Sequence, residues 1–396
     1  MSPTPWLVAV TAVAVISDAM LLPFYPQFFA ARFGVEDPSH VGAYLAMSCL
    51  VVMLALPAWA RLARSVGTLR LLIGTQVVAG GLSLACAVVT SLPGFWGLSL
   101  AMLVAKASYL LVYPYLMHFA PRDRHATLIG TLSVVVHAGG ILGAVIGGLV
   151  LEHWQAAQVF QVMAVSDALQ VAVCLLLLRR GRAPHSLPHA APATPPAPGT
   201  SGAILRLGLV MLLFYLSATL ARPFFAQYWA LASGLSGELL AGAVFAIPGG
   251  VAVALLALDL LGRRPGGEAI AAPLAIGLTG LLLQASGEIA ALLAGRLLFG
   301  WALFRVTVRL EVRLFRLSTP DRYASDFSKI HLFQGLGVLI ASWGAGRLVD
   351  AQGPTGPFLV AALGFALCAL AHRLLLTTAE ATPARPIDPV SARTRP

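Results

Sequence analysis

The feature that most constrains this chain is an apolar stretch, long enough to cross a lipid bilayer, that recurs along nearly the whole sequence. A membrane-spanning helix needs about 20 consecutive apolar residues. In hydrocarbon every backbone N–H and C=O must find a partner within the protein, so such stretches form helices and not an open sheet. We expect twelve spans, at residues 5–30, 41–62, 69–91, 95–119, 126–152, 156–179, 204–231, 237–260, 268–286, 289–312, 324–350 and 355–378.

Composition supports the same fold class. Of the 396 residues, 58% are hydrophobic and 11% are charged, whereas a soluble domain carries roughly 25% charged residues. The first stretch is longer than the core of a signal peptide and carries Asp18 in its middle, so we count it as the first span. The sequence therefore predicts an all-α integral membrane protein with twelve transmembrane helices.

The formal charge of +10 indicates how the helices are oriented. Lys and Arg accumulate in short cytoplasmic loops because they resist translocation. Here the arginines gather in alternate loops, on the side that also holds both chain ends. We expect a multi-pass protein of a bacterial inner membrane with both termini in the cytoplasm.

The first and seventh spans repeat each other at an offset of about 200 residues, which is what a duplicated six-helix unit gives. The matched residues are Ser17, Pro23, Phe24, Gln27, Ala30 and Gly34 with Ser217, Pro223, Phe224, Gln227, Ala230 and Gly234. Residues 181–203 are rich in Pro, Ala and His and too polar to span a bilayer. We predict an N-terminal six-helix half (1–180), a cytoplasmic linker (181–203), a C-terminal six-helix half (204–380) and a disordered cytoplasmic tail (381–396).

Twelve spans in two parallel halves with a long central loop resemble the major facilitator superfamily. The motif of that family after the second span is partly present, since Gly67 and Arg70 are kept while Arg64 replaces the usual acid. A second copy retains the acid in Asp259, followed by Gly262 and Arg263. In the family this aspartate pairs across helix ends at the inward gate, so the resemblance assigns the gating role to Asp259.

The fifth span carries Gly130, Gly139, Gly143 and Gly147, a spacing similar to the antiporter motif of exporters in this family. Ala144 replaces the usual proline. Small residues let helix backbones approach closely. Generic packing of small residues is the alternative explanation of this pattern.

Charges inside the spans are the candidate functional residues, because a charged side chain at the bilayer centre costs roughly 2.5–3.5 kcal/mol. Asp18 is the candidate for proton coupling, and a fixed ion pair with Lys106 is the alternative. The family resemblance places Asp18, Lys106, Arg222 and Arg305 around one central cavity, a set with net positive charge that predicts an anionic substrate. We assign Asp167 a structural role. The remaining predicted substrate-binding residues are Tyr25, Gln27, Tyr109 and Gln227.

The chain has no Walker motif and no catalytic or metal-binding motif, and its four cysteines lie in apolar spans. We therefore expect no enzymatic activity, cofactor or nucleic-acid partner. We expect the protein to be a monomer. Its predicted partners are a small molecule, protons and the lipid bilayer.

The predicted function is export of a small polar or anionic solute by proton antiport. The run from Ser17 to Pro26 is similar to bacterial siderophore exporters. Three alternatives stay open. They are a multidrug exporter, which predicts an acidic cavity; a proton-coupled importer of an organic anion or nutrient; and a receptor that transports nothing.

Overall fold

The computed structural model describes residues 4–112, 115–116, 125–180, 200–235, 237–260, 269–318 and 323–377. The first helices in the described part are α1 (Thr4–Ala19), α2 (Tyr25–Phe33), α3 (Pro38–Val66), α4 (Thr68–Val88), α5 (Leu92–Lys106), η1 (Ala107–Leu111), α7 (His125–His153) and α8 (Gln158–Arg179). They are followed by α9 (Thr200–Thr219), α10 (Phe225–Ser233), α11 (Glu238–Leu260), α12 (Ala271–Ala285), α13 (Ile289–Leu317), α14 (Tyr323–Gln352), α15 (Gly356–His372) and η3 (Arg373–Thr377).

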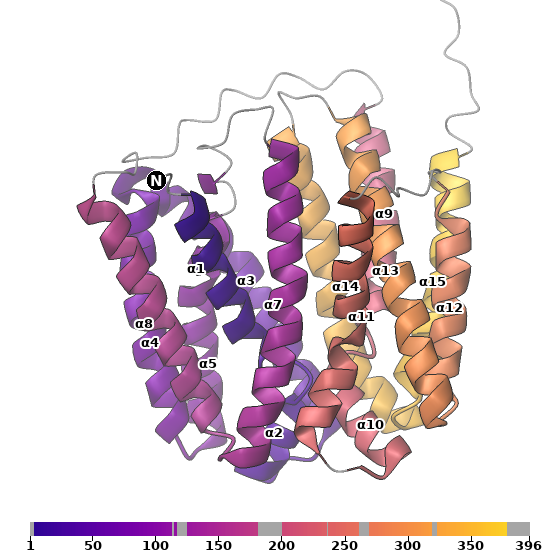
Figure 1. The fold of residues 1–396 in the computed structure, drawn as a ribbon, viewed down its shortest axis with the longest axis horizontal. Coiled ribbons are helices and arrows are strands. Elements are labelled where there is room, and N and C mark those ends of the chain that lie inside the picture. The colour runs from indigo at the N-terminus through magenta and orange to yellow at the C-terminus, as the bar shows by residue number, and fades with distance from the viewer. Residues whose placement is uncertain are drawn as a thin grey trace, which may run out of the picture.

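The predicted fold class is confirmed, because the described chain is a bundle of long helices (Figure 1). Within the described residues, ten helical segments are long and apolar enough to cross a bilayer, and the shorter apolar helices α1 and α12 occupy the two remaining predicted spans. Several helices extend beyond the predicted limits. The largest extension is α3, which begins at Pro38 and ends at Val66 where residues 41–62 were expected.

The first predicted span, 5–30, is wrong in one respect: it is two helices and not one. Proline lacks an N–H and its ring clashes with the carbonyl four residues earlier, so Pro23 ends α1 at Ala19. The chain restarts as α2 at Tyr25. The seventh span, predicted at 204–231, is divided in the same way by Pro223, after which α10 begins.

The repeat read from the sequence is present in the backbone. Both breaks fall at matching positions 200 residues apart, and the short helices that follow them end at equivalent glycines. Gly34 has φ 66° and Gly234 has φ 68°, a left-handed conformation that glycine adopts without steric cost. Each glycine donates its N–H to the carbonyl of the alanine four residues before it.

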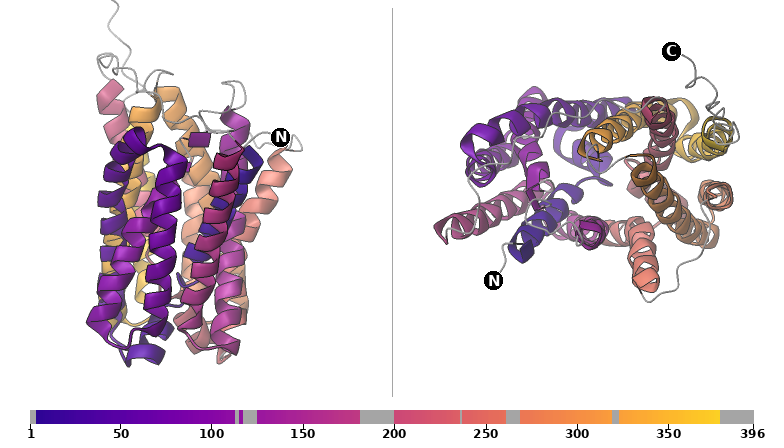
Figure 2. Two further views of the ribbon diagram at one scale, coloured as in Figure 1. Left: turned by 90° about the vertical axis from the view of Figure 1, so that its left-hand side faces the viewer. Right: turned by 90° about the horizontal axis from the view of Figure 1, so that it is seen from above.

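The helices form two groups, which we call the N-terminal half (α1–α8) and the C-terminal half (α9–α15) (Figure 2). Helix α7 packs on α11 and helix α3 packs on α14, and these pairs join the halves. The bundle has a terminal end, where the described chain begins and finishes, and a far end, which carries α2 and α10 (Figure 1). The predicted linker and tail fall largely outside the described residues, so the domain boundaries stay a prediction.

The halves are in direct backbone contact toward the far end. A Cβ atom on Gly148 of α7 would lie 2.5 Å from the Glu238 carbonyl oxygen of α11. On the other side of the bundle, a Cβ atom on Gly42 of α3 would lie 2.8 Å from the Ser342 carbonyl oxygen of α14. Side chains at these positions would push the halves apart, so the far end is closed by direct backbone contact.

Two polar contacts fasten this closed end, one on each side. The Glu152 carboxylate, at the end of α7, accepts a hydrogen bond of 2.8 Å from the Leu239 N–H in the first turn of α11. The Ser39 hydroxyl, in the first turn of α3, donates to the Asp350 carboxylate at the end of α14. Each contact joins an acid of one half to the first turn of a helix in the other half, where the helix dipole also favours a negative charge.

We expect the double change Glu152→Gln with Asp350→Asn to weaken far-end closure, because capping contacts of this kind contribute about 0.5–2 kcal/mol each. Spin labels at the exposed far-end positions 36 and 235, one in each half, should show a longer distance population in the variant. Glu288→Gln is the matched control, since Glu288 is an exposed far-end acid whose side chain caps no helix. An unchanged distance distribution would show that the glycine contacts alone hold the far end.

Candidate functional site

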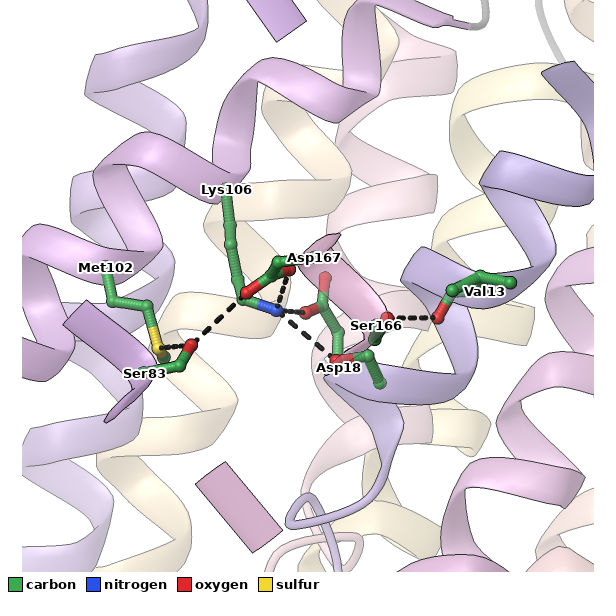
Figure 3. A network of polar contacts seen from close by, with 8 residues as sticks. Val13, Asp18, Ser83, Met102, Lys106, Ser166 and Asp167 are labelled. Carbon is green, nitrogen blue, oxygen red and sulfur yellow. Dashed lines mark hydrogen bonds and ion pairs between the residues drawn. The ribbon is translucent and has the colours of Figure 1, made fainter. Parts of the chain in front are cut away.

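The centre of the N-terminal half holds a buried cluster of three charges (Figure 3). Lys106, the last residue of α5, is 4% exposed, and its ammonium lies 3.1 Å from Asp167 of α8 and 3.3 Å from Asp18 of α1. The Asp167 side chain is fully buried, whereas the Asp18 side chain is 30% exposed. The cluster therefore has one carboxylate enclosed by protein and one that is partly exposed.

Hydrogen bonds with uncharged side chains and with the backbone fix this cluster in place. The Ser83 hydroxyl donates to the second oxygen of Asp167 at 3.2 Å, and Lys106 donates to the Ser17 hydroxyl at 3.3 Å. Ser166, next to Asp167, donates to the Val13 carbonyl and ties α8 to α1. Four helices, α1, α4, α5 and α8, thus contribute to one network, in which the lysine bridges the two acids.

The charge balance of this cluster differs from the one predicted. The cavity residues predicted from the sequence included Asp18 and Lys106 but not Asp167, which was assigned only a structural role. With Asp167 in direct contact with the lysine, two carboxylates face one ammonium, and the net charge of the cluster is negative when both acids are ionised. The signal that could have found this contact is the triplet Ser-Asp-Ala, which occurs at residues 17–19 and again at 166–168.

The antiporter-motif glycines pack against the segment that carries Asp18. A Cβ atom on Gly139 would lie 2.9 Å from Val15, and one on Gly143 would lie 2.6 Å from the Ile16 carbonyl oxygen. Gly147 meets the backbone of Met20, where the break in the first span begins. The side-chain surroundings of position 130 lie outside the described residues. Three of the four motif glycines thus set how closely α7 lies against α1.

Arg305 does not join Lys106. It lies in α13 of the C-terminal half and forms a two-pronged ion pair with Asp259 near the end of α11, at 3.0 and 2.7 Å. A predicted substrate-binding residue and a predicted gating residue are therefore partners within one half. The Asp259 carboxylate compensates the positive charge of Arg305. Gly262 and Arg263 of the same motif lie outside the described residues.

The other predicted residues are spread along the bundle. Tyr25 packs against Tyr44 with ring centroids 5.3 Å apart, and Gln27 lines a far-end cavity of about 470 Å³. Tyr109 packs against an apolar cluster that includes Leu7. Gln227 is half-buried in α10. These four side chains therefore do not form one compact group.

At the first motif, Gly67 lies between α3 and α4 with φ 90° and donates its N–H to the Ala63 carbonyl. Its positive φ explains why glycine is kept there. Arg70 is exposed in the first turn of α4. The C-terminal half also holds Arg222, Arg296 and Glu311. Of these three residues, only Arg222 was predicted from the sequence to bind substrate.

This arrangement, a bundle of spanning helices in two repeated halves with ionisable groups enclosed at mid-depth, defines a membrane transport protein. Residues 7–283 match the family described as the Major Facilitator Superfamily. The chain belongs to that family: it is a multi-pass membrane transporter and not an enzyme.

A curated relative is the multi-drug resistance efflux pump PmrA homolog of Lactococcus lactis subsp. lactis (strain IL1403), which is 26% identical over 177 residues. The match spans 42% of this chain and 42% of that protein, less than half the length of either.

Solved transporters share the fold at low identity. A bacterial homolog of the human lysosomal transporter Spinster, in an inward-facing and occupied conformation, has a TM-score of 0.75 and 13% identity, covering 96% of this chain and 98% of that chain. The human organic anion transporter MFSD10 has a TM-score of 0.71 and 16% identity, covering 94% and 100%. The nucleoside transporter NupG has a TM-score of 0.69 and 14% identity, covering 95% and 99%.

Proposed function

We propose that the protein exports a small polar or anionic solute from a bacterial cytoplasm in exchange for protons. The observation that carries the proposal is the unequal pair of acids around Lys106. Asp167 is fully enclosed and in contact with the ammonium, whereas the Asp18 side chain is 30% exposed. Asp18 can therefore take up and release a proton while Lys106 stays held by Asp167.

Protonation of Asp18 changes the charge of the cluster from −1 to zero. It also weakens the contact that holds α1 to α5, because a neutral carboxyl binds an ammonium less strongly than a carboxylate does. Asp18 lies in the last turn of α1, next to the break at residues 20–24 and against the glycines of α7. A proton bound by Asp18 would lie beside the point where the first span is broken. We propose that this bend links the proton to the change of access.

Loop charge and the closed far end support the proposed direction of transport. The arginine-rich loops favour a cytoplasmic terminal end, and in that orientation the far end faces outward. In this orientation the closed outer end leaves the inner side to receive substrate. Release to the outside then requires the far-end contacts to part. A siderophore-like substrate remains a prediction from the first span.

A multidrug exporter of lipophilic cations is the second candidate. It predicts an acidic cavity, and the cluster at Lys106 carries a net negative charge when both acids are ionised. The efflux pump from Lactococcus lactis that matches part of the chain is described as a multi-drug resistance protein. The two candidates differ in the charge of the solute that they export.

Asp18→Asn should abolish the part of export that a proton uncoupler inhibits, because an amide cannot bind and release a proton at this site. The test expresses the parent and the variant in bacteria lacking their own exporters and follows release of labelled siderophores and of tetraphenylphosphonium, with and without uncoupler. Glu36→Gln, which neutralises an exposed acid between helices, is the control and should export as the parent does. Export by Asp18→Asn that remains uncoupler-sensitive would reject Asp18 as the coupling acid, and net accumulation would reject export.

A further inference from the structure

A second charged centre lies in the C-terminal half, around Arg296 of α13. This arginine is 5% exposed. Its Nε donates to the Val244 carbonyl at 3.3 Å, and its guanidinium also donates to the Phe245 carbonyl. Pro248 lies in the same helix, α11, and has no N–H to offer the carbonyl four residues earlier. Arg296 therefore supplies the donor that the helix lacks at Val244.

This structural role explains the hydrogen bonds of Arg296 but not its charge. A neutral amide side chain could donate to the same carbonyls without bringing a cation into the membrane. The other groups around the guanidinium are also neutral: Gln284 at 3.5 Å and the Phe225 ring, whose centroid lies 4.1 Å away. Among the described residues no carboxylate forms an ion pair with Arg296. A buried cation without a counter-ion is costly unless an anion visits the site.

Arg222 brings a second positive charge to the same place. Its guanidinium lies 5.9 Å from the centroid of the Phe245 ring, and Arg296 lies 5.6 Å from the same centroid. Arg222 sits in the break between α9 and α10, directly before Pro223, and its side chain is exposed. It has no hydrogen bond or ion pair from its side chain within the described part of the chain. Two guanidinium groups thus flank one phenyl ring, one fixed and one free to bind.

One acid of this half, Glu311, is linked to Arg222 only indirectly. Glu311 of α13 interacts electrostatically with the Tyr215 hydroxyl, which also interacts with Arg222. Glu311 itself makes no ion pair with Arg222 or Arg296 among the described contacts. Tyr215 also forms a hydrogen bond with Thr307 of α13. The exposed Arg222 side chain therefore lies beside the buried Phe245 ring and within the electrostatic reach of Tyr215.

We propose that Arg222 and Arg296 form the binding site for an anionic group of the transported solute, with a carboxylate as the simplest such group. Arg222 binds the anion directly through its planar fork of donors. Arg296, held by the α11 carbonyls, supplies a fixed positive potential behind it. The inference rests on the proposed function and deepens it by naming the chemical class of the substrate.

The other predicted cations cannot perform this role as readily. Lys106 is held by two carboxylates, and Arg305 is held by Asp259. An anion would have to displace a carboxylate at either residue, whereas Arg222 is paired with no carboxylate among the described contacts. The two proposed sites are therefore divided between the halves, with proton-binding acids in the N-terminal half and anion-binding arginines in the C-terminal half.

The test measures binding to the purified protein in detergent, where no proton gradient is present. Thermal unfolding is recorded with sodium succinate, citrate, benzoate and 2,3-dihydroxybenzoate, with sodium chloride at matched ionic strength, and with tetraphenylphosphonium chloride. A ligand that binds the folded protein raises its melting temperature in a concentration-dependent way. We expect at least one of the carboxylates to stabilise the protein beyond the chloride control.

Arg222→Gln should then raise the apparent Kd of that carboxylate by about tenfold or more, because it removes a charge-assisted contact. Arg222→Lys should retain part of the affinity, and Arg296→Lys should weaken binding while still offering a donor to the α11 carbonyls. Arg347→Gln is the matched control, because Arg347 is an exposed arginine of α14 that likewise lies over an aromatic ring, that of Trp343, at 5.4 Å. It should bind the carboxylate as the parent does.

The proposal is overturned if no carboxylate stabilises the parent protein, or if Arg222→Gln binds as tightly as the parent. Stabilisation by tetraphenylphosphonium alone would overturn it in favour of a cationic substrate. These outcomes are independent of proton coupling, which is read from transport by Asp18→Asn. If no carboxylate binds but export stays sensitive to the uncoupler, the anion site is rejected and the antiporter proposal is retained. If a carboxylate binds but export is insensitive to the uncoupler, the antiporter proposal is rejected and the anion site is retained.

Discussion

Replacing Lys106 with methionine should sharply reduce the amount of folded protein in the membrane. The change leaves Asp167 fully buried with Ser83 as its remaining hydrogen-bond donor among the described residues. Breaking a buried ion pair by removing one partner costs about 3–5 kcal/mol, because the other charge stays buried and uncompensated. The measurement is the yield of monodisperse protein after detergent extraction, together with its melting temperature.

A second substitution separates the charge effect from a loss of packing. Adding Asp167→Asn to Lys106→Met removes both buried charges, and replacement of a whole buried pair by neutral groups is often tolerated. We expect the double variant to recover most of the folded yield while remaining inactive in coupled export. Arg347→Met is the control, since Arg347 is an exposed basic residue of α14 that forms no ion pair among the described contacts. If the double variant folds as poorly as Lys106→Met alone, the defect comes from lost packing and not from the unpaired buried charge.

Leucine at Gly143 should separate α7 from α1 and abolish export. The Cβ of any side chain there would lie 2.6 Å from both the Ile16 carbonyl oxygen and the Ala19 Cβ, so backbone and not only side chains must move. Overpacking of a tight core contact typically costs about 1–3 kcal/mol, and here the displaced segment carries Asp18.

Gly140→Leu provides the matched control, because a Cβ at Gly140 meets nothing within 4 Å. Both variants lie on one helix and add the same side chain, so they differ only in what the side chain meets. Export and melting temperature are measured for both. Equal behaviour of the two variants would mean that the contact between α7 and α1 does not limit transport.

Much of the fold was predictable because hydrocarbon leaves the backbone few choices. The length of the apolar stretches predicted the spans. The matched prolines Pro23 and Pro223 indicate where the first and seventh spans are broken. The breaks were nevertheless missed, since Met20 to Phe24 is itself mostly apolar and hydropathy does not distinguish a helix from a turn that neighbouring helices cover. Proline chemistry, applied at Ala19 and Thr219, would have located them.

The site was predictable in its residues but not in its pairings. Asp18 and Lys106 were singled out because charges are rare in spans. Which charges meet depends on helix rotation, which the spacing along one helix does not fix. Asp167 was therefore underestimated, and Arg305 was assigned to the substrate where the structure pairs it with Asp259. Arg296 escaped notice, because a buried arginine near a helix end resembles a residue that snorkels to the interface.

The glycines of α7 have a mechanical consequence. This helix touches α1 through Gly139, Gly143 and Gly147 and touches α11 of the opposite half through Gly148 and the Ala144 carbonyl. No flexible side chain separates the backbones at these contacts, so the three helices have little room to move independently. We propose that parting of α7 from α11 shifts α7 against Ile16, Ala19 and Met20, on either side of Asp18. On this proposal, opening of the outer end and release of the ammonium by Asp18 belong to one movement.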